Sequence, residues 1–131
     1  MFRYRNEAAF SNAFVKHLRN YGWFVQRIES GTTGRGIPDI YCVSPQGNAF
    51  WFELKRVHTD FGWCSHKYKI PWRPGQQAWL HCIHSYKQQA YTLCCYNNAI
   101  VVIPHNKMYE EDSISCRDVV ERWYKWSDVV K

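Results

Sequence analysis

The sequence lacks any apolar run of about 18 residues, the length that a membrane-spanning helix needs. Its first residues, MFRYRNEAAF, lack the continuous apolar segment of a secretory signal. The six cysteines form no C-x-x-C pair, and a disulfide between the adjacent Cys94 and Cys95 would be strained. We therefore expect free, partly buried thiols in a cytoplasmic protein, because the cytosol keeps thiols reduced.

Acidic residues are in the minority, since 11 Asp and Glu stand against 17 Lys and Arg, for a formal net charge of +6. This balance favours an acidic partner, of which nucleic acid is the commonest, although the same charge also serves solubility. Apolar residues make up 46% of the chain, so it is globular rather than disordered. Its 131 residues are enough for a single domain with one core.

Hydrophobic periodicity predicts one α/β domain over residues 1–131, in the element order α-β-β-β-α-β-β-α. The helices are expected at Arg5–Asn20, Gly75–Tyr86 and Ser115–Val130. The strands are expected at Trp23–Ile28, Asp39–Val43, Ala49–Lys55, Tyr91–Cys95 and Ala99–Ile103, with a hairpin turn at SPQGN. The core is expected over about residues 5–103, with an irregular, basic and aromatic insertion at 57–74 and a helical segment at 109–131.

Two neighbouring predicted strands carry charges where a buried strand should be apolar. Side chains alternate along a strand, so Glu53 and Lys55 share one face, and the hairpin brings Asp39 to the same end of the sheet. Two carboxylates this close repel each other unless a cation lies between them, and hard oxygen ligands suit Mg²⁺ or Mn²⁺. The simpler interpretation is that Glu53 and Lys55 form a solvated charge pair and that Asp39 is a turn residue.

Each of the first two predicted helices places a polar residue on its apolar side. Glu7 lies three residues before Phe10 and seven before Phe14, so it falls on the stripe that faces the core. Gln76 lies three residues before Trp79 and points toward the sheet for the same reason. A buried carboxylate is costly without a partner, whereas an ordinary first-turn charge is stabilised by the helix dipole.

This combination resembles the PD-(D/E)xK nuclease superfamily, with Pro-Asp at 38–39, Glu-Leu-Lys at 53–55, and the helical residues Glu7 and Gln76. The segments GIPDIY, WFELKR and PGQQAWL are most similar to the VRR-NUC branch and to phage and archaeal Holliday-junction resolvases. The resemblance covers about residues 7–103. It implies a restriction-endonuclease-like core, with a central mixed sheet flanked by helices.

The resemblance also implies metal-dependent hydrolysis of DNA phosphodiester bonds, and it implies the catalytic residues Glu7, Asp39, Glu53, Lys55 and Gln76. Asp39 and Glu53 would hold Mg²⁺ or Mn²⁺ with the backbone carbonyl of Leu54, and Glu7 would complete the shell directly or through water. Lys55 would orient the attacking water or stabilise charge on the phosphate. Gln76 would position Lys55 or a phosphate oxygen.

Cations near these segments are candidate contacts for DNA phosphates: Arg35, Arg56, Lys67, Lys69 and Arg73. The aromatic residues interleaved with them in residues 57–74 either stack on unpaired bases or cover the core. A zinc site at His58, Cys64 and His66 is the alternative for this segment, although the spacing matches no zinc finger or ribbon.

The partner and the reaction stay open between several interpretations. The leading one is a structure-selective nuclease of a phage or mobile element, with branched DNA as one candidate substrate and a homodimer as one candidate assembly. The C-terminal segment packs either on the domain or on a second copy of the chain. A sequence-specific restriction or homing nuclease is the second, and a non-catalytic nucleic-acid-binding module is the third. RNA is an open alternative to DNA.

Overall fold

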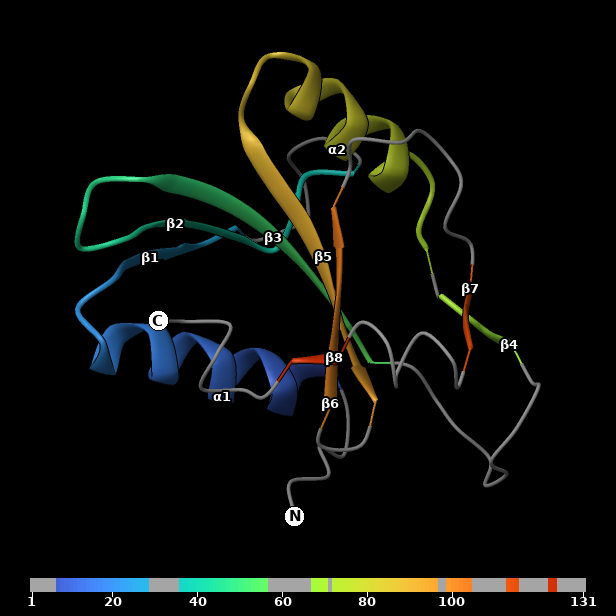
Figure 1. Ribbon diagram of the computed structural model, residues 1–131, viewed down its shortest axis with the longest axis horizontal. Helices are drawn as coiled ribbons and strands as arrows, with labels where there is room; N and C mark the ends of the chain where they lie inside the picture. Colours follow the sequence, from blue (N-terminus) through green and yellow to red (C-terminus); the bar gives the residue numbers. More distant parts are fainter. Residues whose placement is uncertain are drawn as a thin grey trace.

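Figure 1 shows the computed structural model of the chain, which describes residues 7–28, 36–56, 67–70, 72–96, 99–104, 113–115 and 123–124. The helices are α1 (Glu7–Asn20) and α2 (Gln76–Ser85). The strands are β1 (Phe24–Arg27), β2 (Ile40–Val43), β3 (Ala49–Arg56), β4 (Lys67–Lys69), β5 (Gln89–Tyr96), β6 (Ala99–Pro104), β7 (Ser113–Ser115) and β8 (Trp123–Tyr124). Six strands form one sheet in the order β1-β2-β3-β5-β6-β8, and β4 pairs with β7 in a second sheet.

The main sheet is mixed around β3, which runs antiparallel to β2 and parallel to β5. Two parallel neighbours cannot be joined by a tight turn, so the chain has to cross over one face of the sheet. Helix α2 forms part of that crossover and contacts β5, while α1 lies on the other side of the sheet (Figure 1). This arrangement confirms the predicted α/β class, with a mixed sheet flanked by helices.

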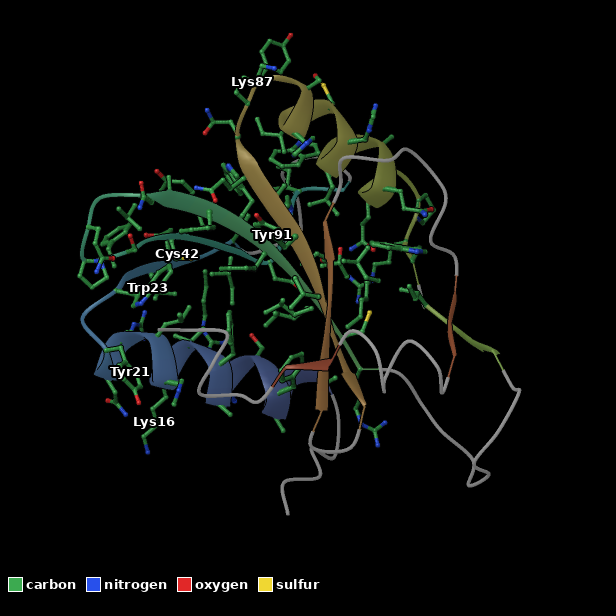
Figure 2. The ribbon with its side chains drawn as sticks, viewed as in Figure 1. Lys16, Tyr21, Trp23, Cys42, Lys87 and Tyr91 are labelled. Atoms are coloured by element: carbon green, nitrogen blue, oxygen red, sulfur yellow. The ribbon has the colours of Figure 1, made fainter. Side chains whose placement is uncertain are left out.

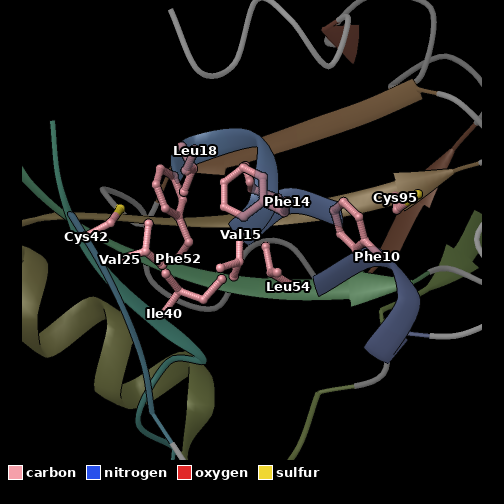
Figure 3. Packing of buried hydrophobic residues seen from close by; sticks show 11 residues of the cluster. Phe10, Phe14, Val15, Leu18, Val25, Ile40, Cys42, Phe52, Leu54 and Cys95 are labelled. Atoms are coloured by element: carbon pink, nitrogen blue, oxygen red, sulfur yellow. The ribbon is translucent and has the colours of Figure 1, made fainter. Parts of the chain in front are cut away.

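The alternation of side chains along β3 decides which helix each residue meets. Phe52 and Leu54 are buried against α1, where the Phe14 ring meets the Phe52 ring edge-on at 5.4 Å between centroids (Figure 3). Trp51 points to the opposite face, where its ring lies 5.0 Å from that of Trp79 on α2. Glu53 and Lys55 follow Trp51 on this α2 face because of the two-residue period.

The predicted hairpin at SPQGN is confirmed between β2 and β3. The last strand pair is Val43 with Ala49, and the Ser44 N–H donates a hydrogen bond to the Asn48 carbonyl at 2.8 Å. The Asn48 N–H in turn donates to Ser44 Oγ at 3.1 Å. Gly47 has a φ of +90°, a conformation that glycine adopts without strain, so this turn fixes the register that aligns the two strands.

The predicted helix over Ser115–Val130, within the helical segment expected at 109–131, is wrong at the positions that the structure describes. Ser115 lies in β7, and Trp123–Tyr124 form β8, which pairs antiparallel with β6. Helical spacing of the large apolar residues suggested the helix. Aromatic residues such as Trp123 and Tyr124 favour strands, however, and the edge of β6 offers backbone groups with which a strand can pair.

The segment at residues 57–74 is predicted to be irregular, and the structure differs there too. Lys67–Lys69 form β4, which pairs antiparallel with β7 so that Lys67 lies opposite Ser115. The insertion and the C-terminal region therefore meet in one small sheet. The zinc candidates His58, Cys64 and His66 lie outside the described residues.

The described cysteines are free, as predicted. Cys42, Cys94 and Cys95 are buried and Cys82 is exposed. Burial raises the pKa of Cys42 and of Cys95 to about 12, so these thiols stay protonated and unreactive at neutral pH. Among the described residues, neither helix has the length and apolar character needed to cross a membrane.

Candidate active site

Two ionisable side chains of β3 are buried on the face that α2 covers. Glu53 is 1% exposed and Lys55 is 2% exposed, although both belong to residue types that are almost never fully buried unless paired. Removing either charge from water is costly without specific partners. The hydrogen-bond and ring partners of these two residues therefore indicate which chemistry the site can support.

Asp39 lies directly before β2 and reaches β3 across the hairpin. Its backbone carbonyl accepts a hydrogen bond from the Ile28 N–H at 2.8 Å, which ties it to the end of β1. Its carboxylate oxygen Oδ2 accepts a hydrogen bond from the Leu54 N–H at 3.1 Å. Because Leu54 stands between Glu53 and Lys55, this bond brings all three charged residues to one end of the sheet, as the hairpin predicted.

Gln76, the first residue of α2, is 6% exposed and contacts Glu53 from above the sheet. Its Nε2 donates to Glu53 Oε1 at 3.1 Å and to Oε2 at 3.2 Å, while its Oε1 accepts from the Arg73 N–H at 2.8 Å. The Arg73 amide therefore fixes which end of the Gln76 side chain faces Glu53. A donor aimed at both oxygens suits an ionised carboxylate.

This partner differs from the one expected for Gln76. The resemblance implied that Gln76 positions Lys55 or a phosphate oxygen, which stays a prediction, and the structure shows a contact with Glu53. The reason is geometric, because Gln76 starts the helix directly above the strand position of Glu53. Gln76 therefore orients the Glu53 carboxylate.

Two glycines allow α2 to begin this close to the sheet. Gly36 and Gly75 both have positive φ, +89° and +85°, and their backbones pack against each other. A Cβ atom at Gly36 would overlap the carbonyl group of Gly75 and lie 3.0 Å from the backbone N of Gln76. The contact therefore sets where α2 starts and where Gln76 points.

Replacing Gly36 by Ala is expected to displace the start of α2. The change combines an unfavourable φ with backbone overlap, so we expect the free energy of unfolding to fall by about 3 kcal/mol or more. Gly47→Ala is the matched control, since its φ is +90° but nothing lies within 4 Å of the added Cβ, and it should cost about 1–2 kcal/mol. Urea unfolding of both variants measures the difference; equal losses would show that the contact is unimportant.

Lys55 has an aromatic neighbour from the segment that precedes α2. Its Nζ lies over the Trp72 ring, 5.8 Å from the centroid, within the range of a cation–π interaction. The backbone N–H of Trp72 donates to the Ile70 carbonyl at 2.8 Å, and Ile70 is itself buried. The sequence does not predict that Trp72 contacts Lys55, because no pattern in residues 57–74 indicates which strand this segment packs against.

The remaining predicted residues differ in position and in how much of each the structure describes. Arg73 is exposed beside Gln76 and can meet a phosphate, whereas Arg56 is half-buried and shares the α1 face of β3 with Leu54, away from Glu53. Glu7 is the first residue of α1, but its side chain is not described. Three further candidates cannot be placed by their side chains: Lys67 and Lys69, known only as backbone in β4, and Arg35, which lies outside the described residues.

The donor set fits a hard divalent cation in its chemistry. Asp39 and Glu53 offer carboxylate oxygens, which are the ligands that Mg²⁺ and Mn²⁺ prefer in proteins. Among the described side chains, no three His, Cys, Asp or Glu groups gather into a metal site. Asp39 and Glu53 are thus two carboxylate ligands at most here, and the Leu54 carbonyl and Glu7 stay predicted ligands.

Solved structures match this fold over nearly its full length. A Holliday junction resolvase, Hjc, from the archaeon Archaeoglobus fulgidus matches with a TM-score of 0.64 and 12% sequence identity, covering 95% of this chain and 99% of its own. The fold is restriction-endonuclease-like. A bacterial homing endonuclease, I-Ssp6803I, matches with a TM-score of 0.57 and 11% identity, covering 95% of this chain and 88% of its own. No protein-family model matches the sequence, and none of the curated proteins matches it significantly.

Proposed function

We propose that this chain is a metal-dependent endonuclease that hydrolyses DNA phosphodiester bonds with a PD-(D/E)xK-type site. The observation that carries the proposal is the Glu53 carboxylate, buried on β3 and oriented by Gln76, with Asp39 held beside it through the Leu54 amide. Folding two carboxylates and an ammonium into one sheet end costs free energy that a purely structural site has no need to bear. The restriction-endonuclease-like fold supports the same interpretation.

Each residue of the site has its own part in the proposed chemistry. Asp39 and Glu53 hold Mg²⁺ or Mn²⁺, which when bound polarises the scissile phosphate and lowers the pKa of a water ligand. Lys55 supplies a positive charge near the phosphate or its attacking water. Gln76 keeps the Glu53 carboxylate in one orientation, and the exposed Arg73 guanidinium contacts the DNA backbone at the edge of the site.

Branched DNA is our first choice of substrate, with a homodimer cutting opposite strands. The support is the match to a Holliday junction resolvase over 99% of that chain, together with the GIPDIY and WFELKR segments, which favour the VRR-NUC branch and a phage origin. The homing endonuclease match supports the second candidate, a nuclease that cuts linear duplex at defined sites. A purely binding module is disfavoured, because carboxylates repel phosphates unless a metal intervenes.

Cleavage assays test the proposal directly. The purified chain should cut a four-way junction in Mg²⁺ or Mn²⁺ faster than it cuts linear duplex, flap or single-stranded DNA, and EDTA should stop the reaction. Lys55→Ala should lose the activity, and Lys16→Ala, which removes a lysine projecting from α1 away from the sheet (Figure 2), should keep it. Cuts at one defined duplex site would favour the homing-type interpretation, and no metal-dependent cleavage of any substrate, RNA included, would overturn the proposal.

A further inference from the structure

The Lys55 side chain is buried, and its ammonium contacts an aromatic ring that comes from outside β3. The side chain is 2% exposed, so bulk water solvates little of it. The face of Trp72 lies over its Nζ at 5.8 Å, and Trp gives the strongest cation–π interaction of the aromatic residues. Trp72 comes from the chain segment before α2, well beyond the end of β3, so the contact depends on the tertiary fold.

The segment that carries Trp72 is held in place on both sides of the ring, and on its C-terminal side it is bonded to the site. Before it, Ile70 is 2% exposed and its carbonyl accepts the Trp72 N–H. After it, the Arg73 N–H donates to Gln76 Oε1, whose Nε2 binds Glu53. This segment therefore connects the ring over the ammonium with the helix start that orients the carboxylate.

We propose that Trp72 is a positioning residue, which holds the Lys55 ammonium in a single place beside Asp39 and Glu53 through the face of its indole ring. A lysine ammonium stands on a flexible stem of four carbons, so without a fixed partner it samples many positions. A carboxylate partner would offset the positive charge of the ammonium, whereas the ring restricts the position of the ammonium and leaves its charge available. The catalytic consequence rests on the proposed nuclease function, whereas the restriction of Lys55 does not.

Two variants separate ring chemistry from packing. Trp72→Phe keeps an aromatic face, and Trp72→Leu keeps an apolar side chain without one. Nuclear Overhauser effects between the Lys55 ε-methylene and the indole protons should be seen in the wild type, and ¹³C relaxation should show the Lys55 methylenes ordered in the wild type and in Trp72→Phe. In Trp72→Leu the same methylenes should become mobile, while circular dichroism shows the fold intact.

Cleavage then reports the consequence for catalysis. Trp72→Leu should lower the turnover rate by about 10- to 100-fold with little change in KM, and Trp72→Phe should recover most of it, because a misplaced group costs rate rather than binding. If Lys55 stays equally ordered in Trp72→Leu, or shows no contact with the indole in the wild type, the positioning role is overturned. If Lys55 order follows the ring but the wild type cuts nothing, the positioning contact stands as a structural feature and the nuclease proposal fails.

Discussion

The double variant Glu53→Gln with Gln76→Glu is expected to recover most of the stability that the single changes lose and to leave DNA uncut. This swap places the amide on β3 and the carboxylate on α2. The amide on the strand can then donate to one oxygen of the carboxylate on the helix, whose second oxygen still accepts the Arg73 N–H. The hydrogen bonds of the pair survive with their direction reversed, but the carboxylate has moved from the strand to the helix.

The single variants should differ in a way that identifies the network. Glu53→Gln keeps one acceptor oxygen for Gln76 and sets an N–H group against another, so we expect a loss of about 1–2 kcal/mol in the free energy of unfolding. Gln76→Glu sets two buried carboxylates against each other and should cost about 3–5 kcal/mol. Urea unfolding of all four proteins gives the coupling energy of the pair, which should be clearly favourable.

Cleavage by the same four proteins separates stability from catalysis. Magnesium demands near-octahedral geometry at short distances, so a carboxylate moved to the helix cannot replace the one on the strand. We expect Glu53→Gln and the swapped variant to be inactive alike. Wild-type cleavage by the swapped variant would show that Glu53 acts only through its bond to Gln76, and no favourable coupling would show that this bond is not formed.

Asp39→Asn is expected to abolish cleavage with little effect on folding. The Asn side-chain oxygen can still accept the Leu54 N–H, so the hydrogen bond across the hairpin is kept while the negative charge is lost. Loss of a charged metal ligand should reduce the cleavage rate by at least about a hundredfold. Thermal unfolding should change little, because the carboxylate is not fully buried.

Asp39→Ala is the comparison that isolates the structural part of this residue. It removes both the charge and the acceptor of the Leu54 N–H, so it should be inactive and also less stable than Asp39→Asn by about 1–2 kcal/mol. Substantial cleavage by Asp39→Asn would mean that the carboxylate serves the hairpin rather than the chemistry.

Local periodicity was enough to predict which charged residues in or directly before β2 and β3, and which residue of α2, belong to the site. The alternation along Ala49–Arg56 placed Glu53 and Lys55 on one face, and the turn at residues 44–48 brought Asp39 to the same end of the sheet. Helical spacing also predicted that Gln76 faces the sheet. Each of these inferences depends on neighbours within one hairpin or one helix, where sequence spacing and spatial distance are closely linked.

Contacts between distant segments could not be predicted in the same way. The Gly36–Gly75 packing, the bond from Gln76 to Glu53, and Trp72 above Lys55 all depend on how the crossover sets α2 on the sheet. No local pattern encodes such distances. At the C-terminal end, the apolar spacing around Trp123 fitted a helix, but the residue types and the edge of β6 favoured a strand.

Binding of Mn²⁺, followed by amide NMR signals, tests most directly whether Asp39 and Glu53 form one divalent-cation site. The unpaired electrons of a bound Mn²⁺ should broaden the amide signals of Asp39, Leu54 and Gln76 at substoichiometric metal, and should broaden much less those of Lys16 on α1 and Lys87 after α2 (Figure 2). EDTA should restore the signals, and Asp39→Asn should prevent the broadening. Sharp site signals in the wild type, or equal broadening in Asp39→Asn, would contradict the account.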